Sequence, residues 1–245
     1  MAEPIDDCLH DRVVRQLLHS GEFQPGDRVV ETQLAARLGV SRIPLRESLG
    51  RLRGQGLLVS DGPGRGLRMR HYSLQEISQF YEFRELLEGG AARAAARVAS
   101  PADIARLEAI HGRAESVAKQ GGFESAEWRD ADHGFHAALA DAGHNERLGQ
   151  AMALLLAELH GLFYGVLYRR VAAAGGRSLT RAAALRHAAR AVREHRSVIA
   201  AIRARDADRA ERRARLHVRN AARRIRAALT TLQAAAADRT LLTEA

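Results

Sequence analysis

Cysteine and long apolar runs are almost absent from this 245-residue chain. The single cysteine, Cys8, can form no internal disulfide, and a thiolate-rich zinc site is excluded. The longest apolar run, around Ala151–Ala157, falls far short of the roughly 20 residues that a membrane-spanning helix needs. Residues 1–7 are acidic and lack an apolar core, so we expect no signal peptide. We therefore predict a cytoplasmic protein with no membrane partner.

Lysine is scarce as well, so almost all of the positive charge comes from arginine. Lys and Arg together number 38 against 29 Asp and Glu, which gives a formal net charge of +9. A basic balance favours anionic partners, of which nucleic acid is one and a membrane surface another. The hydrophobic content of 46% is ordinary for a globular protein and argues against disorder.

The composition changes near residue 70, which suggests two domains. Glycine-rich turns and β-branched residues lie before this point, and long stretches of Ala, Leu, Arg and Glu, typical of helices, lie after it. A chain of this length accommodates two domains of roughly 100–200 residues or somewhat less. We predict one domain over residues 1–72, a second over residues 73–237 and a flexible tail over residues 238–245.

The first domain has the order of a winged helix-turn-helix. Helical spacing predicts helices over residues 11–19 and 31–38, and Gly39 then interrupts the chain. Ser41 is a suitable N-cap for a third helix, and Pro44 fits its first turn. Three leucines of that helix recur at i, i+4 and i+7 and define its buried face. Two strands forming a wing are predicted over residues 57–60 and 67–70.

The second domain is predicted to contain helices throughout. Ser73 and Glu76 have the spacing of a capping box, which places a helix start there. Residues 172–179, with adjacent glycines, are predicted as a loop. The fold class is therefore mainly α, with the winged helix-turn-helix followed by an all-α antiparallel helical bundle. The predicted bundle helices cover residues 73–98, 100–120, 125–142, 145–171, 180–205 and 207–237.

Two arginines at the start of the third helix are suited to reading DNA. Arg42 and Arg46 are four residues apart and share the face opposite the leucines. The second helix of a helix-turn-helix enters the major groove, and arginine makes bidentate contacts with guanine or phosphate. The Ser41 hydroxyl suits a phosphate. A solvated helix face is the alternative interpretation of these residues.

The predicted wing adds a second candidate contact. Glycines at 62, 64 and 66 allow the backbone to approach a sugar-phosphate strand closely, and Arg65 is available for the minor groove. A plain hairpin turn is the alternative.

Residues 12–70 closely resemble the winged-helix domain of GntR-family regulators. The resemblance rests on Pro25-Gly26-Asp27, Leu38-Gly39-Val40-Ser41-Arg42, Pro44-Leu45-Arg46-Glu47-Ser48-Leu49 and Gly64-Arg65-Gly66. It implies a mode of DNA contact in which Thr32 replaces an arginine of some relatives and Ile43 replaces the usual threonine. The residues predicted to contact DNA are Ser41, Arg42, Ile43, Pro44, Arg46, Gly64, Arg65 and Gly66.

Four residues of the second domain form a candidate metal site. Asp132 and His136 lie four apart on one helical face, while His195 and His217 each neighbour apolar residues that suggest inward-facing positions. One carboxylate and three imidazoles suit zinc, nickel, manganese or iron, with positions left for water or a ligand. Because the chain has 11 histidines, ordinary capped or surface histidines remain the alternative.

Residues 74–230 look like the effector domain of the FadR-type branch of the GntR family, the FCD domain. The matching text includes Arg84-x-x-x-Glu88, Asp132-x-x-Phe135-His136 and His195-x-x-x-Ile199. The resemblance implies a divalent metal, with zinc favoured over nickel, manganese or iron, on Asp132, His136, His195 and His217. It also implies that the metal and nearby arginines hold a small carboxylate metabolite. Arg84 is the predicted effector contact, with a helix-surface ion pair to Glu88 as the alternative.

The sequence thus predicts a metabolite-responsive transcription regulator that is not an enzyme. We expect a homodimer on a pseudo-palindromic operator in double-stranded DNA, and a repressor in preference to an activator. A metalloenzyme is the rival from another class, since a metal with open positions activates water. The sequence offers it no convincing general base, because Glu194 points about 100° away from His195 on a helix. A nonspecific, charge-driven DNA binder is the third possibility.

Overall fold

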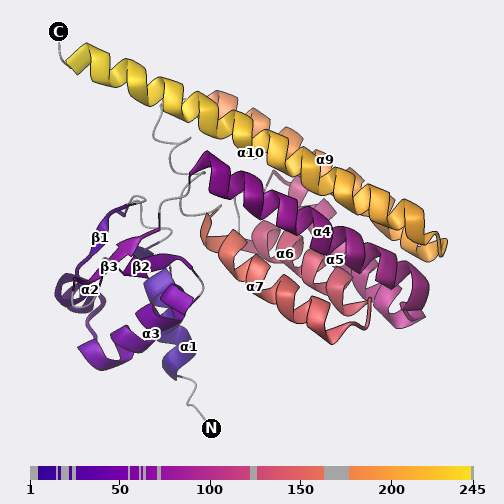
Figure 1. The fold of residues 1–245 in the computed structure, drawn as a ribbon, viewed down its shortest axis with the longest axis horizontal. Coiled ribbons are helices and arrows are strands. Elements are labelled where there is room, and N and C mark those ends of the chain that lie inside the picture. Colours follow the sequence, from indigo (N-terminus) through magenta and orange to yellow (C-terminus); the bar gives the residue numbers. More distant parts are fainter. Residues whose placement is uncertain are drawn as a thin grey trace. The chain divides into compact units, whose positions relative to one another are not determined.

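The structure, a computed structural model, describes residues 5–14, 16–17, 22–23, 26–54, 56–60, 62, 65–70, 73–121, 126–162 and 177–243. It divides into two compact units, Met1–Ser73 with Ala157–Ala173 and Leu74–Leu156 with Ala174–Ala245. The first unit contains α1 (Ile5–Val14), β1 (Arg28–Val29), α2 (Glu31–Leu38), α3 (Arg42–Gly54), β2 (Leu58–Ser60) and β3 (Leu67–Met69) (Figure 1).

The sheet of the first unit has three antiparallel strands in the order β1-β3-β2. Arg28 of β1 lies opposite Arg68, and Leu58 of β2 lies opposite Met69. The sequence predicted only the two strands of the wing, β2 and β3. Strand β1 was missed because two residues are too few to show an alternating pattern, and its pairing depends on the fold.

The turn between α2 and α3 depends on a left-handed residue. Gly39 has φ 65°, ψ 36°, a conformation that a side chain disfavours, and the amide of Val40 returns a hydrogen bond to the carbonyl of Ala35 at 3.1 Å. The turn directs the apolar faces of both helices into one core, which also receives residues of α1 and the sheet. This core includes Val13, Val29, Leu34, Leu45, Leu49, Leu52 and Leu58.

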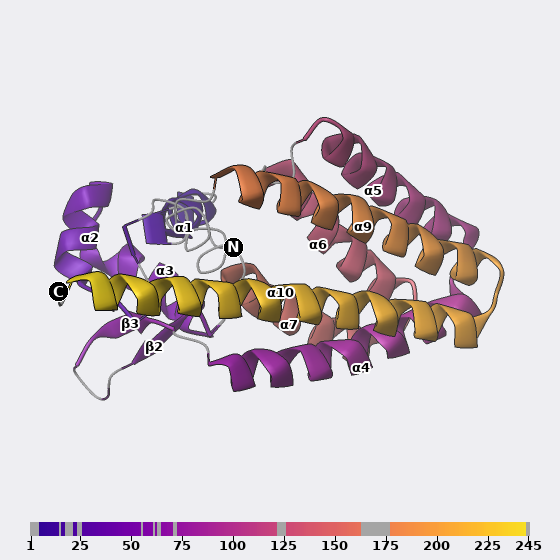
Figure 2. The same ribbon diagram turned by 90° about the horizontal axis from the view of Figure 1, so that it is seen from above.

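The second unit is a bundle of helices, as predicted. Figures 1 and 2 place α10 alongside α4, and α5 packs against both α6 and α9. Its helices are α4 (Leu74–Val98), α5 (Pro101–Lys119), α6 (Ala126–Asp141), α9 (Arg177–Arg203) and α10 (Ala207–Thr243), together with the part of α7 (Glu146–Leu162) that ends at Leu156.

Small residues allow α4 to lie close to its neighbours. Ala91, Ala92 and Ala95 of α4 are fully buried, and they present little side-chain volume at the helix contacts. At Gly89 an added Cβ would lie 2.8 Å from the Arg215 side chain, so glycine makes room for Arg215 as it crosses from α10. The start of α5 is fixed by a capping box in which Ser100 and Asp103 satisfy each other's backbone amides.

Several predicted helix ends differ from the structure. Helix α9 begins at Arg177, inside the predicted loop 172–179, and the rest of that loop lies outside the described residues. Helix α10 continues to Thr243, so most of the predicted tail is helical, in keeping with the high helix propensity of its alanines. Helix α1 starts at Ile5 rather than near residue 11. Among the described residues no helix is long and apolar enough to cross a membrane.

Candidate functional site

Helix α3 presents one apolar and one exposed face. Its leucines are at most 1% exposed, while Ile43 is 74% exposed on the other side and Pro44 is half-buried in the first turn. Arg42 and Arg46 retain 56% and 61% of their side-chain surface. The outward face therefore matches the one derived from helical spacing, with Ser41 exposed immediately before it. Contact of these residues with DNA stays a prediction.

Glu31, the first residue of α2, links the two arginines of α3. The Nε of Arg46 donates to Glu31 Oε2 at 2.7 Å, and Arg42 Nη2 lies 3.8 Å from the same oxygen. One carboxylate thus restrains both guanidiniums at the N-terminal end of α3 without burying them. This contact could not be predicted from helical spacing, because the residues face each other across the turn between two helices.

The wing is braced by an arginine from another strand. Arg28 Nη2 donates to the backbone carbonyl of Arg65 at 3.2 Å, and the Arg65 side chain is exposed. Gly66 has φ 91°, which requires glycine. The predicted contact residue Gly64 lies outside the described residues.

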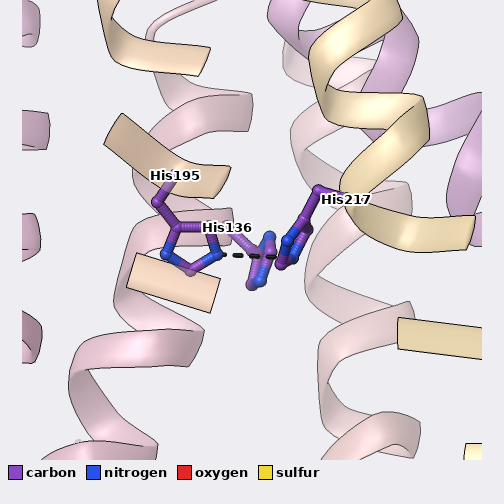
Figure 3. A group of neighbouring side chains, drawn as sticks. All are labelled: His136, His195 and His217. Carbon is purple, nitrogen blue, oxygen red and sulfur yellow. Dashed lines mark hydrogen bonds between the residues drawn. The ribbon is translucent and has the colours of Figure 1, made fainter. Parts of the chain in front are cut away.

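Three histidines from three helices converge in the interior of the second unit (Figure 3). His136 of α6 and His195 of α9 have no exposed surface, and His217 of α10 is 4% exposed. The Nε2 atoms of His195 and His217 lie 3.3 Å apart, and one nitrogen of each ring lies within 4.8 Å of the others. The ring of Phe135 stacks on His195 with centroids 3.9 Å apart. The structure therefore brings together three of the four predicted metal ligands.

The fourth predicted ligand, Asp132, lies at the edge of this histidine cluster. Its Oδ1 is 3.9 Å from His195 Nε2, and its side chain is 22% exposed, in contrast with the buried imidazoles. One turn of α6 separates it from His136, which is the spacing that the sequence indicated. Asp132 thus borders the cluster from the side that is open to solvent.

Two carboxylates fix the orientation of two of the imidazoles. Glu88 Oε2 lies 3.0 Å from His136 Nδ1, and Glu194 Oε2 lies 2.9 Å from His217 Nδ1. Because an ionised carboxylate only accepts, Nδ1 of His217 carries the proton and its Nε2 presents a lone pair. In His136 the guanidinium of Arg84 donates to Nε2, so the proton lies on Nδ1, on the side of Glu88. This arrangement, a carboxylate behind a histidine, is the one found around metal-binding imidazoles.

Glu194 is a site residue that the sequence missed. Its angle to the neighbouring His195 excluded it as a general base at that residue. It instead accepts a hydrogen bond from His217 of the adjacent helix α10. Asn220 Nδ2 also donates to it at 2.6 Å. Only the pairing of α9 with α10, which helical spacing within one element cannot reveal, brings these groups together.

The interior favours the neutral form of His195 and His217. Burial, reinforced by the neighbouring imidazoles of His217 and His136, holds the pKa of His195 well below its ordinary value. Burial also lowers the pKa of His217, although its hydrogen bond to Glu194 opposes the shift. Neutral imidazoles are the form that binds metal ions.

Arg84 contacts His136 of the cluster and forms a buried ion pair with Glu88. Its Nε donates to Glu88 Oε1 at 2.5 Å and its Nη2 lies 2.9 Å from His136 Nε2. The ion pair with Glu88 at i+4 is present, but it is not on the helix surface as the alternative assumed, since the side chains are 5% and 1% exposed. Burial would raise the pKa of Glu88, but Arg84 and His136 outweigh it and hold that pKa below its usual range.

The two halves of the chain match known families. Residues 12–68 match the bacterial regulatory proteins of the gntR family, and residues 79–220 match the FCD domain. The chain belongs to the GntR family and carries an FCD domain. This confirms the family predicted from the sequence, whose named relatives are transcriptional regulators.

Three relatives of this chain have names that describe regulators. It is 35% identical over 129 residues to the Nta operon transcriptional regulator of Aminobacter aminovorans, covering 53% of this chain and 60% of that protein. It is 35% identical over 152 residues to LutR of Bacillus subtilis, covering 56% and 67%. It is 34% identical over 171 residues to a putative L-lactate dehydrogenase operon regulatory protein of Escherichia coli, covering 60% and 62%. The chain thus spans about three fifths of the length of these relatives.

Solved structures share the fold. McbR/YncC of Escherichia coli superposes with a TM-score of 0.64 at 19% identity, over 95% of this chain and 98% of that one. A GntR regulator of Rhodococcus sp. RHA1 also has a TM-score of 0.64, at 21% identity, over 90% and 95%.

The buried pair of Arg84 and Glu88 should be essential for stability. We expect Arg84→Met to lower the free energy of unfolding by about 3–5 kcal/mol, because it leaves a buried carboxylate without its main counter-charge. The control is Arg106→Met, which breaks a pair with Asp141 whose side chains are 57% and 52% exposed and should cost less than about 1 kcal/mol. Urea unfolding followed by fluorescence of Trp128, the single tryptophan, measures both. Equal small losses would refute the buried role.

Proposed function

We propose that this GntR-family protein is a metabolite-responsive transcription regulator, more specifically a repressor, that binds a pseudo-palindromic operator as a homodimer in the cytoplasm. The observation that carries the proposal is that one chain combines an exposed arginine face on α3 with a buried histidine cluster in its FCD domain. In a symmetric dimer each α3 would enter one half-site, which gives the operator its inverted repeat.

The residues of the histidine cluster fit a divalent metal. Tetrahedral zinc with Zn–N bonds of about 2.0–2.1 Å places two nitrogen ligands about 3.3 Å apart. The separation of 3.3 Å between the Nε2 atoms of His195 and His217 agrees with that value. His136, His195 and His217 would hold the ion and Asp132 would complete the set. A bound metal supplies a Lewis-acidic position for a carboxylate oxygen.

Arg84 connects the metal to the effector in this proposal. Its Nη2 contacts His136 Nε2, the nitrogen that faces the cluster. When this lone pair is used for a metal, Arg84 loses that acceptor and has an N–H available for another one. A carboxylate beside the metal supplies such an acceptor. This supports the predicted role of Arg84 as an effector contact.

The effector class follows from the same chemistry. A neutral imidazole cluster with one adjacent carboxylate leaves a divalent ion with positive charge that an anionic ligand neutralises. One relative is named for an L-lactate dehydrogenase operon, and lactate is a small carboxylate. We therefore propose a small carboxylate metabolite as the effector. It acts by favouring one of two arrangements of the DNA-binding domains, and operator affinity changes only by its differential affinity for the two.

Charge reversal on α3 tests the DNA-binding assignment. We expect Arg42→Glu to weaken binding to operator fragments selected from genomic DNA by at least about tenfold, because one bidentate arginine contact contributes about 1–3 kcal/mol. Arg53→Glu, at the other end of α3, makes the same change in net charge and should leave most of the affinity. Fluorescence anisotropy at fixed salt measures both. Equal losses in the two variants would favour the nonspecific binder.

Removal of imidazoles tests the metal centre. His195→Ala and His217→Ala should each lose bound zinc after loading and dialysis, measured by elemental analysis. Glu194→Gln should weaken zinc binding by roughly 10–100-fold, because it removes the negative charge of the group that orients His217. His144→Asn alters an exposed histidine and should bind zinc normally. An unchanged zinc content in both alanine variants, with helical circular dichroism retained, would refute the site.

A further inference from the structure

Arg224 of α10 carries a guanidinium that no residue in the described part of the chain fully pairs. Its Nε, Nη1 and Nη2 atoms are all buried, and none makes a hydrogen bond within the described part of the chain. It forms an ion pair with Glu194, but Nη1 lies 3.9 Å from Oε1, beyond hydrogen-bonding distance. The side chain as a whole is 20% exposed.

Glu194 is already engaged by other donors. Its Oε2 accepts from His217 and its Oε1 accepts from Asn220 at 2.6 Å. Arg190 of α9 also approaches Oε1, at 3.6 Å from its Nε. One carboxylate therefore faces two guanidiniums and two neutral donors, and it cannot satisfy the five N–H groups of Arg224 as well.

This arrangement is costly in the isolated protein. A buried charged donor without an acceptor loses its hydration and gains nothing in return. The pKa of Arg224 accordingly falls below its ordinary value, because burial outweighs the attraction of Glu194. Buried polar groups in folded proteins almost always have partners, so an unmatched guanidinium indicates that a partner arrives from outside.

The unsatisfied guanidinium of Arg224 lies on the same helix as His217 of the histidine cluster. It follows His217 by seven residues on α10, which is two turns along the same helical face and a rise of about 10.5 Å. Glu194 lies next to both side chains, and the negative charge of Asp132 acts on Arg224 as well. Arg84, in contrast, has its charge neutralised by Glu88.

We propose that Arg224 binds a second anionic group of the effector, so that the effector is a small dicarboxylate rather than a monocarboxylate. This inference rests on the proposed function: one carboxylate lies at the metal and Arg84, and the other lies at Arg224. The planar guanidinium donates to both oxygens of a carboxylate at once, which matches the unsatisfied N–H groups. The separation along α10 requires the two anionic groups to lie on different atoms of the ligand.

The test compares acids that differ by one carboxylate. The zinc-loaded full chain is titrated by calorimetry with three pairs: malonate and propionate, succinate and butyrate, glutarate and pentanoate. We expect at least one dicarboxylate to bind at least about tenfold more tightly than its partner, as a charge-assisted bidentate contact would give. Arg224→Met should abolish that preference without changing the zinc content, and Arg224→Lys should keep part of it.

Two controls separate ligand binding from a structural role. Arg190→Met removes the other guanidinium near Glu194, but Arg190 is 57% exposed, so the preference should persist. Thermal unfolding of the ligand-free Arg224→Met protein should not begin at a lower temperature, because the variant removes an unsatisfied buried donor. A structural arginine would give the opposite result, a less stable protein with unchanged selectivity.

The outcomes also distinguish this inference from the proposed function. If dicarboxylates bind no better than their partners, or if their advantage survives in Arg224→Met, the role of Arg224 is refuted. Zinc-dependent binding of a monocarboxylate in that case leaves the proposed function intact. If the zinc-loaded protein binds none of the six acids, both the dicarboxylate effector and the carboxylate-binding centre are contradicted.

Discussion

The negative charge of Glu88 in the interior of the helical unit determines how the groups around it must be arranged. Burial of an ionised carboxylate is expensive unless it is paired and hydrogen-bonded, and Arg84 supplies both conditions while His136 lies 3.0 Å from the other oxygen. The same contacts tie α4 to α6 and fix which nitrogen of His136 carries the proton. Glu88, which matters first for stability, thereby also influences which nitrogen of the histidine cluster can bind a metal. Glu194 of α9 makes a similar contact with α10, where it accepts a hydrogen bond from His217 and orients its ring.

The sequence predicted the parts of both sites that lie within a single helix. The leucine spacing on α3 predicted the exposed face that carries Arg42 and Arg46. His136 was indicated by its spacing from Asp132, and His195 and His217 by their apolar neighbours. Contacts between elements were not predictable in this way. Glu31 meets the arginines across a turn, and Glu194 meets His217 across a helix pair. The angle between neighbouring residues on one helix says nothing about either contact.

Dependence on contacts between elements also explains why the predicted fold differs from the structure. Strand β1 exists because β3 offers it hydrogen bonds, and two residues contain no period to detect. The prediction ended the last helix at residue 237 and made residues 238–245 a tail, whereas the alanines before that point favour continuation of the helix to Thr243. Arg224 could not be singled out among the many arginines of α10 until its burial was known. Arg224 stands out because its guanidinium lacks hydrogen-bond partners, and a sequence does not reveal that.

In the proposed mechanism the metal centre joins three helices, so a ligand bound there acts on α6, α9 and α10 together. Ligands shift such an equilibrium only through differential affinity, and a shift from 1:99 to 99:1 requires about 5.5 kcal/mol. A metal-bound carboxylate with arginine contacts is the kind of interaction that can supply part of this energy. Coupling between pocket and operator must also be reciprocal, because binding free energies form a closed cycle.

The most direct test is to measure operator affinity for zinc-loaded and zinc-stripped protein, each with and without the tightest-binding carboxylate. The account predicts that the carboxylate weakens operator binding only when zinc is present. It also predicts that operator DNA weakens carboxylate binding by the same factor. An operator affinity that is indifferent to both zinc and carboxylate would contradict control of DNA binding by the pocket.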